Sequence, residues 1–262
     1  MIRKKLVFIL TAICFSIGLT NCVENPDISD YAYYGILNYN SEFKKTTLVT
    51  TNPYLGELVI ADFNLIEYSP GDCIFAYFSI DFDNQPSEDY YTVTNFQIVS
   101  GKLPVPSASM EIVSELDKND PIYNGVMKDV LAASYYDFRG KIIFEIYYDA
   151  YKEQQYSYSL ICNPEDMDGS GVRTAYLRAV TLGPESQYKE SKADPFVFDA
   201  YELIKNYGKD SIDARNSEFK YKYLDLYIKY CNSIDEEGEH LYRDITAVPS
   251  RFFMASDAIP FY

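Results

Sequence analysis

The sequence predicts an all-β protein, built as a small OB-like barrel followed by a β-sandwich-like domain. Tyrosine and phenylalanine, which favour strands, are abundant: the chain has 27 Tyr and 16 Phe among 262 residues. Several segments alternate apolar and polar residues with a period of two, and Gly or Pro fall between these segments. Many short strands separated by turns are typical of barrels and sandwiches.

Five strand candidates predict the barrel, which we place at 31–106. They are Tyr31–Leu37, Thr46–Thr51, Glu57–Asn64, Ile74–Phe82 and Tyr90–Val99. The fourth candidate alternates most clearly, and its apolar side chains share one face: Ile74, Ala76, Phe78, Ile80 and Phe82. Turn-forming stretches separate the candidates, among them Asn52-Pro53 and Ser69-Pro70-Gly71-Asp72. Five short strands in one run favour a small closed barrel of the oligonucleotide/oligosaccharide-binding type.

The sandwich domain is expected over 107–262, after a boundary within the proline-bearing stretch Lys102–Pro121. Met110–Lys118 in this stretch is expected to form one or two helical turns, and Ala200–Asn206 a short helix that ends at Gly208. The strand candidates beyond the boundary are Lys141–Asp149, Gln155–Cys162, Thr174–Thr181, Phe196–Phe198 and Phe219–Cys231. The last is the longest and has bulky residues on both faces, which predicts a central strand covered on both sides.

The N-terminus has the pattern of a lipoprotein signal peptide at 1–21. Arg3, Lys4 and Lys5 precede the mainly apolar Leu6–Leu19, which is shorter than the ~20 residues that span a bilayer. Leu19-Thr20-Asn21-Cys22 resembles a lipobox, so Cys22 is the expected lipidation site; the alternative is a plain secretory signal. Residues 22–30 read as a polar tether. We therefore expect a cell-envelope protein anchored by lipid, at the periplasmic or outer face of the outer membrane.

The charge of the chain limits its partners. The net charge is −16, and loss of Arg3, Lys4 and Lys5 with the leader gives −16 − 3 = −19. Such a chain repels phosphate backbones, so nucleic acid is excluded as a partner. It also repels an anionic membrane surface, which means that lipid on Cys22 must supply the attachment. A protein partner is expected, and it should present a basic surface.

Cysteine and histidine offer little catalytic chemistry. Beyond Cys22 the chain has Cys73, Cys162 and Cys231, so at most one disulfide can form among them and the fold must depend on its cores. No spacing typical of a zinc site is present. The single histidine, His240, follows Asp235-Glu236-Glu237-Gly238-Glu239 and is expected in an exposed polar turn rather than beside a catalytic cysteine.

The most specific local pattern is Asp166-Met167-Asp168-Gly169-Ser170-Gly171. Oxygen ligands at Asp166, Asp168 and Ser170, with Gly171 in sixth place, match the first half of a calcium loop. The twelfth position, where a bidentate Glu belongs, is Leu177. A turn that uses Asp and Gly for their backbone freedom explains the same residues. We expect no cofactor, with calcium as the alternative.

The remaining candidates have simpler explanations. Ser186 and Lys189 have the spacing of an acyl-transfer motif, but a charged loop after Gly183-Pro184 surrounds them. Tyrosine-rich strands could stack on sugars, although strand propensity explains most of these residues and the chain has no Trp. Acidic pairs such as Glu236-Glu237 and Asp210/Asp213 are expected at the solvated surface. We predict no catalytic residue and no enzymatic activity.

Several short segments resemble the NigD-like lipoproteins. They are Gly71-Asp72-Cys73-Ile74, Tyr90-Tyr91-Thr92-Val93, Ala175-Tyr176-Leu177-Arg178, and Phe198-Asp199 followed by Leu203. After the Leu-Arg pair this chain has Ala179-Val180 where polar residues are expected. The resemblance implies a lipidated barrel-plus-sandwich protein without established catalytic residues. The family is named after a bacteriocin gene cluster, which implies an immunity role.

These sequence observations lead to two hypotheses about function, which belong to different classes. The first is a lipid-anchored, non-catalytic binding or interaction module of the cell envelope, such as an immunity protein. The alternative is an accessory lipoprotein that binds or hydrolyses glycans.

Overall fold

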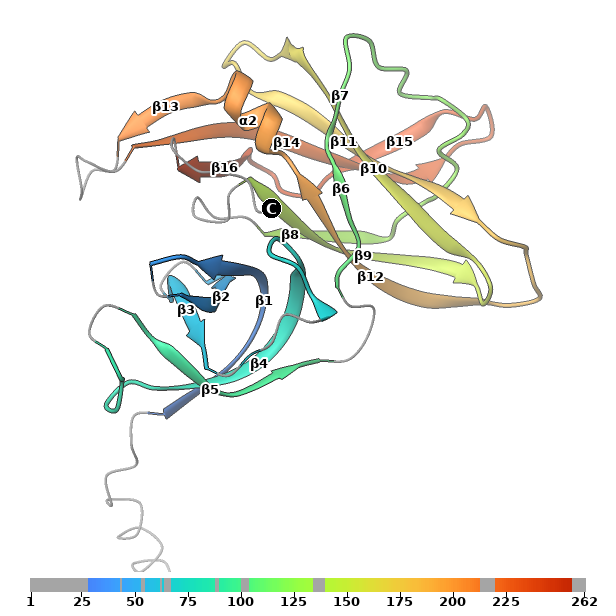
Figure 1. Cartoon of the computed structure of the whole chain (residues 1–262). Helices are drawn as coiled ribbons and strands as arrows, with labels where there is room; N and C mark the ends of the chain where they lie inside the picture. The colour runs from blue at the N-terminus through green and yellow to red at the C-terminus, as the bar shows by residue number, and fades with distance from the viewer. Residues whose placement is uncertain are drawn as a thin grey trace, which may run out of the picture.

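A computed structural model describes residues 28–42, 44–52, 55–61, 63, 67–87, 90–99, 104–133, 140–212 and 220–255. These residues form a closed five-stranded barrel and two further sheets, which lie above the barrel in Figure 1. The predicted fold class, an OB-like barrel followed by a sandwich, is confirmed. The predicted leader, Cys22 and the first part of the tether lie outside the described residues, as do Pro53, Asp213 and Phe219.

The barrel consists of β1 (Ile28–Asn40), β2 (Lys45–Thr50), β3 (Glu57–Ile60), β4 (Cys73–Asp81) and β5 (Thr92–Ile98). Its strand order is β1-β2-β3-β5-β4, and β1 closes the ring because it pairs with both β4 and β2. The partner changes near Gly35, which is in register with Thr50 of β2 and Ile74 of β4. A Cβ at Gly35 would lie 2.6 Å from the Leu48 side chain, so the close approach of β1 and β2 requires glycine there.

Alternation in the sequence explains the barrel core. Ile74, Ala76, Phe78 and Ile80 of β4 are all buried on the inner side, as their period of two predicts. They pack with apolar residues of the other strands, including Leu37, Leu48, Leu58 and Val93. Burial of this apolar surface is the main term that stabilises the barrel.

The sandwich has a four-stranded and a seven-stranded sheet. The smaller sheet has the order β6-β12-β9-β8, with β6 (Ser107–Ser109), β8 (Asp129–Ala133), β9 (Lys141–Tyr151) and β12 (Lys189–Asp199). The larger has the order β13-β14-β11-β10-β7, with β15 and β16 also paired to β14. Its strands are β7 (Glu111–Ile112), β10 (Gln155–Met167), β11 (Arg173–Leu182), β13 (Lys209–Ile212), β14 (Lys220–Ile234), β15 (His240–Asp244) and β16 (Ser250–Ala255).

One large core fills the space between the two sheets. The inner face of β9 contributes Ile142, Phe144 and Ile146, opposite inner residues of β11 and β14 such as Leu177 and Leu226. The short helix α2 (Tyr201–Tyr207) closes the core with Leu203 and Ile204, and the N–H of Gly208 donates to the carbonyl of Ile204 at its end. The predicted helix over 200–206 is therefore confirmed to within one residue.

Two expectations about the sandwich are wrong. Met110–Lys118 is not helical; its first part is β7, which pairs in parallel with β10, and turns follow. β14 is central, as predicted, because β11 and β13 pair along one edge and β15 and β16 along the other. The described residues cover its second face only in part, however, and Tyr221, Tyr223 and Tyr227 there are half-buried.

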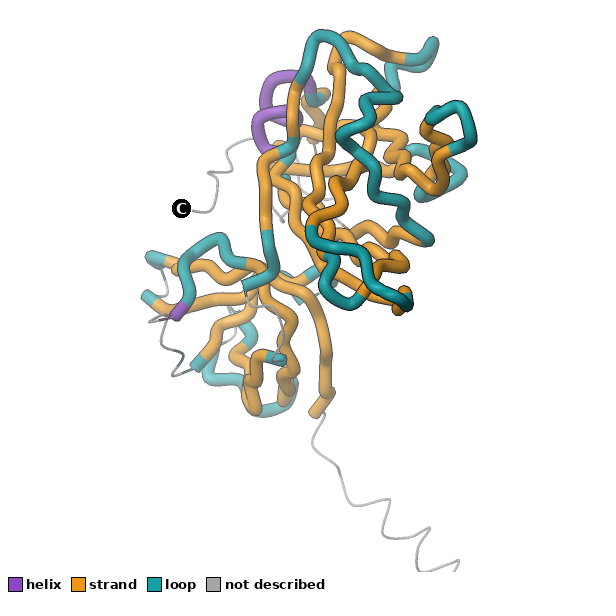
Figure 2. Tube along the Cα trace, turned by 90° about the vertical axis from the view of Figure 1, so that its right-hand side faces the viewer, coloured by secondary structure: helices purple, strands orange, loops and turns teal. Residues whose placement is uncertain are grey.

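The barrel packs on the outer face of the smaller sheet. Ile36, Val49 and Cys73 of the barrel form one buried cluster with Ile143 of β9 and Val197 of β12. Val105, in the connection between barrel and sandwich, belongs to the same cluster, and its N–H donates to the carbonyl of Cys73. Figure 2 shows the barrel and the sandwich as two bodies that meet at this connection. No helix among the described residues is long and apolar enough to span a membrane.

Candidate ligand-binding cavity

The cavity lies at one end of the sandwich, where the β9–β10 hairpin meets the loop between β11 and β12. The Lys192 ammonium holds the hairpin by donating to the carbonyls of Tyr151, Lys152 and Gln154 at 2.8–3.0 Å. The β11–β12 loop starts at Gly183, with φ +94°, and a Cβ there would lie 2.6 Å from the carbonyl oxygen of Glu153. Glycine thus lets the loop pack directly against the hairpin.

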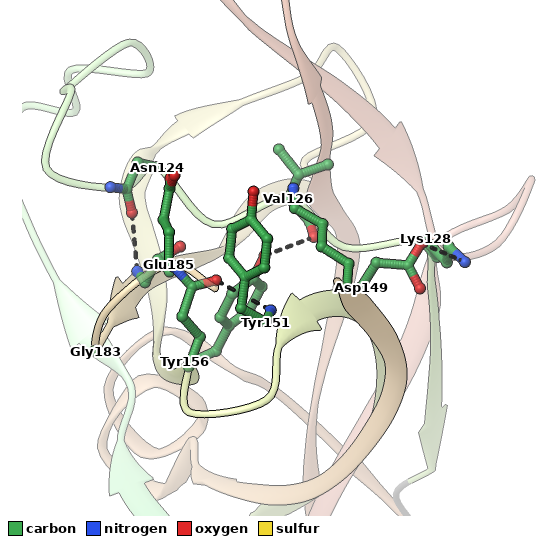
Figure 3. A pocket seen from close by; sticks show the side chains of 11 residues that line it. Asn124, Val126, Lys128, Asp149, Tyr151, Tyr156, Gly183 and Glu185 are labelled. Carbon is green, nitrogen blue, oxygen red and sulfur yellow. Dashed lines mark hydrogen bonds and ion pairs between the residues drawn. The ribbon is translucent and has the colours of Figure 1, made fainter. Parts of the chain in front are cut away.

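This arrangement forms a half-open cavity of about 580 Å³, a size typical of small-molecule sites. Its lining comes from five segments of the sandwich: Asn124, Val126, Lys128, Asp149, Tyr151, Gln154, Tyr156, Thr181, Gly183, Glu185 and Lys189. Figure 3 shows Tyr151 in the middle, with Asn124 and Glu185 on one side and Asp149 and Lys128 on the other. Most of the lining can donate or accept hydrogen bonds.

Tyr151 and Tyr156 provide the aromatic part of the lining, and stacking and a hydrogen bond fix the ring of Tyr156. Tyr156 stacks on Tyr148 with ring centroids 4.1 Å apart, and its hydroxyl donates to the carbonyl of Val126 at 3.2 Å. The hydroxyls of Tyr148 and Tyr158 both donate to the buried carboxylate of Asp194, at 2.6 and 3.2 Å. Burial and this carboxylate raise the pKa of both tyrosines. These contacts fix the ring of Tyr156 in the lining, whereas Tyr148 and Tyr158 support that ring and are not part of the lining.

The charged groups of the lining balance one another. The Lys128 ammonium lies 2.5 Å from an oxygen of Asp149, and the hydroxyl of Ser191 donates to the other oxygen at 2.8 Å. Hydrogen bonds from Lys128 and Ser191 lower the pKa of Asp149. The Lys189 ammonium lies 5.2 Å from the centre of the Tyr151 ring, within the range of a cation–π contact. With Glu185, the lining has two cationic and two anionic side chains.

Asp149 does not have the property that a glycosidase requires of its general acid. A glycosidase needs one carboxyl group with a raised pKa as general acid, beside a second ionised carboxylate. Asp149 has the opposite property, because hydrogen bonds from Lys128 and Ser191 lower its pKa. The described lining also contains no Ser, Cys or His that could serve as an activated nucleophile or its base.

Asp168 forms a turn in the structure. Its carboxylate accepts the N–H groups of Ser170 and Val172 at 2.8 and 2.9 Å, and its own N–H donates to the carbonyl of Val172. Gly171 adopts φ +75°, a conformation that glycine reaches easily. Among the described residues, no group of three or more His, Cys, Asp or Glu is arranged to hold a metal ion. The turn explains why Asp and Gly occur here.

We expect calcium at millimolar concentration to leave the melting temperature unchanged, since Asp168 already uses its carboxylate within the turn. Thermal unfolding with calcium and with chelator measures this directly. A rise that Asp168→Ala abolishes would instead assign a calcium site, because a ligand that binds only the folded state raises its stability.

His240 is not exposed, contrary to the sequence expectation. It starts β15 with 7% of its surface exposed, and its Nδ1 has no hydrogen-bond partner in the described part of the chain. The side chain of Asn119 accepts its backbone N–H at 3.1 Å. It is buried because residues 113–125, which we call the strap, lie over the outer face of the larger sheet. The printed sequence shows the polar turn before His240 but not the distant segment that covers it.

Arg178 of β11 fixes the strap. Its guanidinium donates to the carbonyls of Asp117, Lys118 and Asp120 at 2.7, 3.4 and 3.2 Å and stacks over the ring of Tyr123 at 3.9 Å. Only 2% of Arg178 is exposed. This residue belongs to the Ala175–Arg178 segment of the sequence resemblance, and its role in the fold is to hold a polar loop against a sheet.

We expect the stability of the sandwich to fall below neutral pH because of His240. Burial and the charge of Arg178 lower its pKa, while the Asp117 and Asp120 carboxylates and the Lys118 carbonyl oppose this. As the pH falls through about 6.5, the unfolded state binds a proton that the folded state binds only at lower pH, so folding loses free energy. Urea unfolding between pH 7.5 and 5.5 should show a smaller loss for His240→Gln. Equal losses in both proteins would contradict this prediction.

The other candidates from the sequence lie apart from one another. Cys73, Cys162 and Cys231 are free and buried, and burial raises the pKa of Cys162 and Cys231 to about 11. Ser186 lies in a loop and Lys189 begins a strand, so the helix that the acyl-transfer motif requires does not contain them. Glu236, Glu237 and Asp210 are exposed, as expected.

The comparisons with known proteins add no functional assignment. No protein-family model and no curated protein matches the chain. Among solved structures, a toxin-related protein from Parabacteroides distasonis is 16% identical, with a TM-score of 0.49 over 87% of this chain and 95% of the other. A DUF1344 protein from Bacteroides vulgatus is 15% identical, with a TM-score of 0.48 over 82% and 90%. A NigD-like immunity protein from Bacteroides caccae is 13% identical, with a TM-score of 0.40 over 84% and 93%. Values this low carry no argument about activity.

Proposed function

We propose that this protein is a non-catalytic binding protein of the bacterial cell envelope, anchored through lipid on Cys22, and that it binds its ligand in the sandwich cavity. One observation carries the proposal: the cavity offers tyrosine rings and many hydrogen-bonding groups, and one of its two carboxylates, Asp149, is already paired with the Lys128 ammonium. Such a lining suits recognition, which needs a few well-placed polar groups beside an aromatic surface.

The N-terminal sequence supports the proposed location. Leu19-Thr20-Asn21-Cys22 follows a basic and then an apolar segment, as in lipoprotein leaders. Several acyl chains on one cysteine give stable attachment, whereas a single chain binds only marginally. The acidic mature chain contributes no attraction to an anionic membrane, so the lipid is the anchor.

To test this function, one measures whether the protein retains a ligand from envelope extract without converting it to a product. Full-length protein should enrich a component of envelope extract, and mass spectrometry should find the component chemically unchanged after incubation. Lys189→Glu, which reverses a charge in the cavity, should reduce retention at least threefold. Lys205→Glu makes the same change on the exposed surface of α2 and should not. Cleavage of the retained component by the pure protein, or equal retention by both variants, would overturn the proposal.

A second candidate is an immunity-type protein whose partner is another protein. The net charge of −16 favours this reading, because a strongly acidic surface attracts a basic partner over a distance. Capture of such a partner from envelope extract should weaken steeply as salt rises from low to high concentration, because salt screens exposed charges. A protein partner that stays bound irrespective of salt would argue against the charge-based reading.

A further inference from the structure

The residues that line the cavity also indicate which chemical class of ligand it binds. We propose that the cavity binds a neutral saccharide, with a sugar ring against Tyr151 and hydroxyl groups at the surrounding polar side chains. This inference deepens the proposed binding function and rests on it.

The formal charge of the cavity lining favours a neutral ligand. Lys128 and Lys189 are balanced by Asp149 and Glu185, so the lining has no net formal charge, although the chain as a whole carries −16. An anionic ligand would have to approach an acidic protein without a surplus of cations in the site. A cation would find no surplus of carboxylates, because Asp149 is already paired with Lys128 at 2.5 Å. A neutral ligand meets neither obstacle.

The polar side chains of the cavity lining favour a ligand with many hydroxyl groups. Of the eleven lining residues, only Val126 has an aliphatic side chain, so the cavity cannot desolvate a largely apolar ligand favourably. The amide of Asn124 and the carboxylate of Glu185 lie on one side of Tyr151, and Asp149 lies on the other (Figure 3). Carboxylates and amides accept hydrogen bonds from hydroxyl groups, and ammonium groups donate to them. A ligand with hydroxyl groups around its perimeter satisfies both sides at once.

The position of Tyr151 at the centre of the cavity favours a sugar ring as part of the ligand. Tyr151 is half-buried, and its backbone is fixed by the Lys192 bond to its carbonyl, by the N–H of Gln154 donating to the same oxygen and by pairing with Lys189 of β12. The nearby ammonium of Lys189 makes the ring part of a polarised surface. A flat aromatic ring bordered by acceptors matches a pyranose, which has apolar C–H faces and a hydroxylated edge.

The experiment is a titration of the full-length protein, solubilised in a detergent without a sugar headgroup, with neutral tetrasaccharides of glucose, galactose, mannose and xylose. Calorimetry measures the affinity, and tyrosine fluorescence gives a second readout because the chain has no Trp. At least one tetrasaccharide should bind. Tyr151→Ala should weaken it at least tenfold and Tyr151→Phe less than threefold, since the ring remains. Tyr77→Ala, which removes an exposed tyrosine of the barrel, should have no effect.

Other outcomes overturn the inference in distinguishable ways. Absence of binding by all four tetrasaccharides at 10 mM, or binding that Tyr151→Ala leaves unchanged, would refute the saccharide assignment. Preference for a zwitterionic dipeptide or for an anionic sugar such as polygalacturonate would refute the charge argument but leave a binding function intact. Binding followed by cleavage would keep the ligand class and refute the non-catalytic function instead.

Discussion

Arg178→Ala is expected to destabilise the sandwich by about 3 kcal/mol or more. The substitution removes a buried guanidinium, leaves the carbonyls of Asp117 and Asp120 without their donor, and removes the ring contact with Tyr123. A hydrogen bond from a charged group contributes about 1.5–3 kcal/mol, and Arg178 donates to both carbonyls within 3.2 Å. At roughly 2–4 °C per kcal/mol for a chain of this size, the melting temperature should fall by about 6–12 °C.

Arg251→Ala is the matched control for this prediction. Arg251 likewise donates hydrogen bonds and lies over a tyrosine ring: its guanidinium donates to both carboxylate oxygens of Asp225 at 2.6 and 2.9 Å and lies 4.2 Å from the centre of the Tyr223 ring. Half of its side chain is exposed, however, and exposed ion pairs contribute only about 0–1 kcal/mol. Thermal and urea unfolding of both variants measures the difference. Similar losses for the two arginines would contradict the view that burial under the strap gives Arg178 its importance.

Cys22→Ala is expected to move the protein from the membrane fraction to the soluble fraction. Acyl chains bind membranes through about 0.8 kcal/mol per buried CH₂, so several chains together give attachment that washing does not reverse. The described residues include no helix that could span a membrane in their place. Cell fractionation followed by immunoblotting measures the distribution, and the expected change is nearly complete.

Cys14→Ala is the control for the anchor, because it removes the other cysteine of the leader region and keeps Cys22. This variant should remain in the membrane fraction. Firm retention of Cys22→Ala after a high-salt wash would show that another part of the chain makes the attachment, and the lipobox interpretation would then be wrong. A mass spectrum of the mature N-terminal peptide identifies the lipid directly.

The parts of the fold that depend on local pattern could be predicted from the sequence. The inner face of β4, with Ile74, Ala76, Phe78 and Ile80, follows from its period of two. The end of α2 at Gly208 follows from glycine after an apolar helical stretch. The strand β7 could not be predicted in this way. Two residues pair with β10 across about fifty positions of sequence, and nothing in Glu111 or Ile112 indicates that partner.

The candidate site was harder to predict because its residues come from separate segments. Asn124, Asp149 and Glu185 are ordinary surface residues in the sequence, and contacts between distant segments bring them together. Gly183 packs against the β9–β10 hairpin, and the side chain of Asn124 accepts the N–H of Thr181. The burial of His240 could not be predicted either, because its neighbours in sequence are polar while the distant strap buries it. The abundance of tyrosine was visible, but it could not distinguish Tyr151 in the cavity from tyrosines that only stabilise strands.

The pairing of strands far apart in the sequence has a consequence for how the chain folds. All barrel strands lie within 28–98, whereas β6 pairs with residues 197–199 of β12, and β11 pairs in parallel with residues 226–230 of β14. Contacts between distant segments form slowly, and a chain that is synthesised N-terminus first can close its barrel before β14 has arrived. Until then β10 and β11 have an open edge that can pair with other chains. The risk of aggregation and proteolysis while the chain folds therefore depends on how long β14 takes to pair. It depends less on the stability of the finished sandwich.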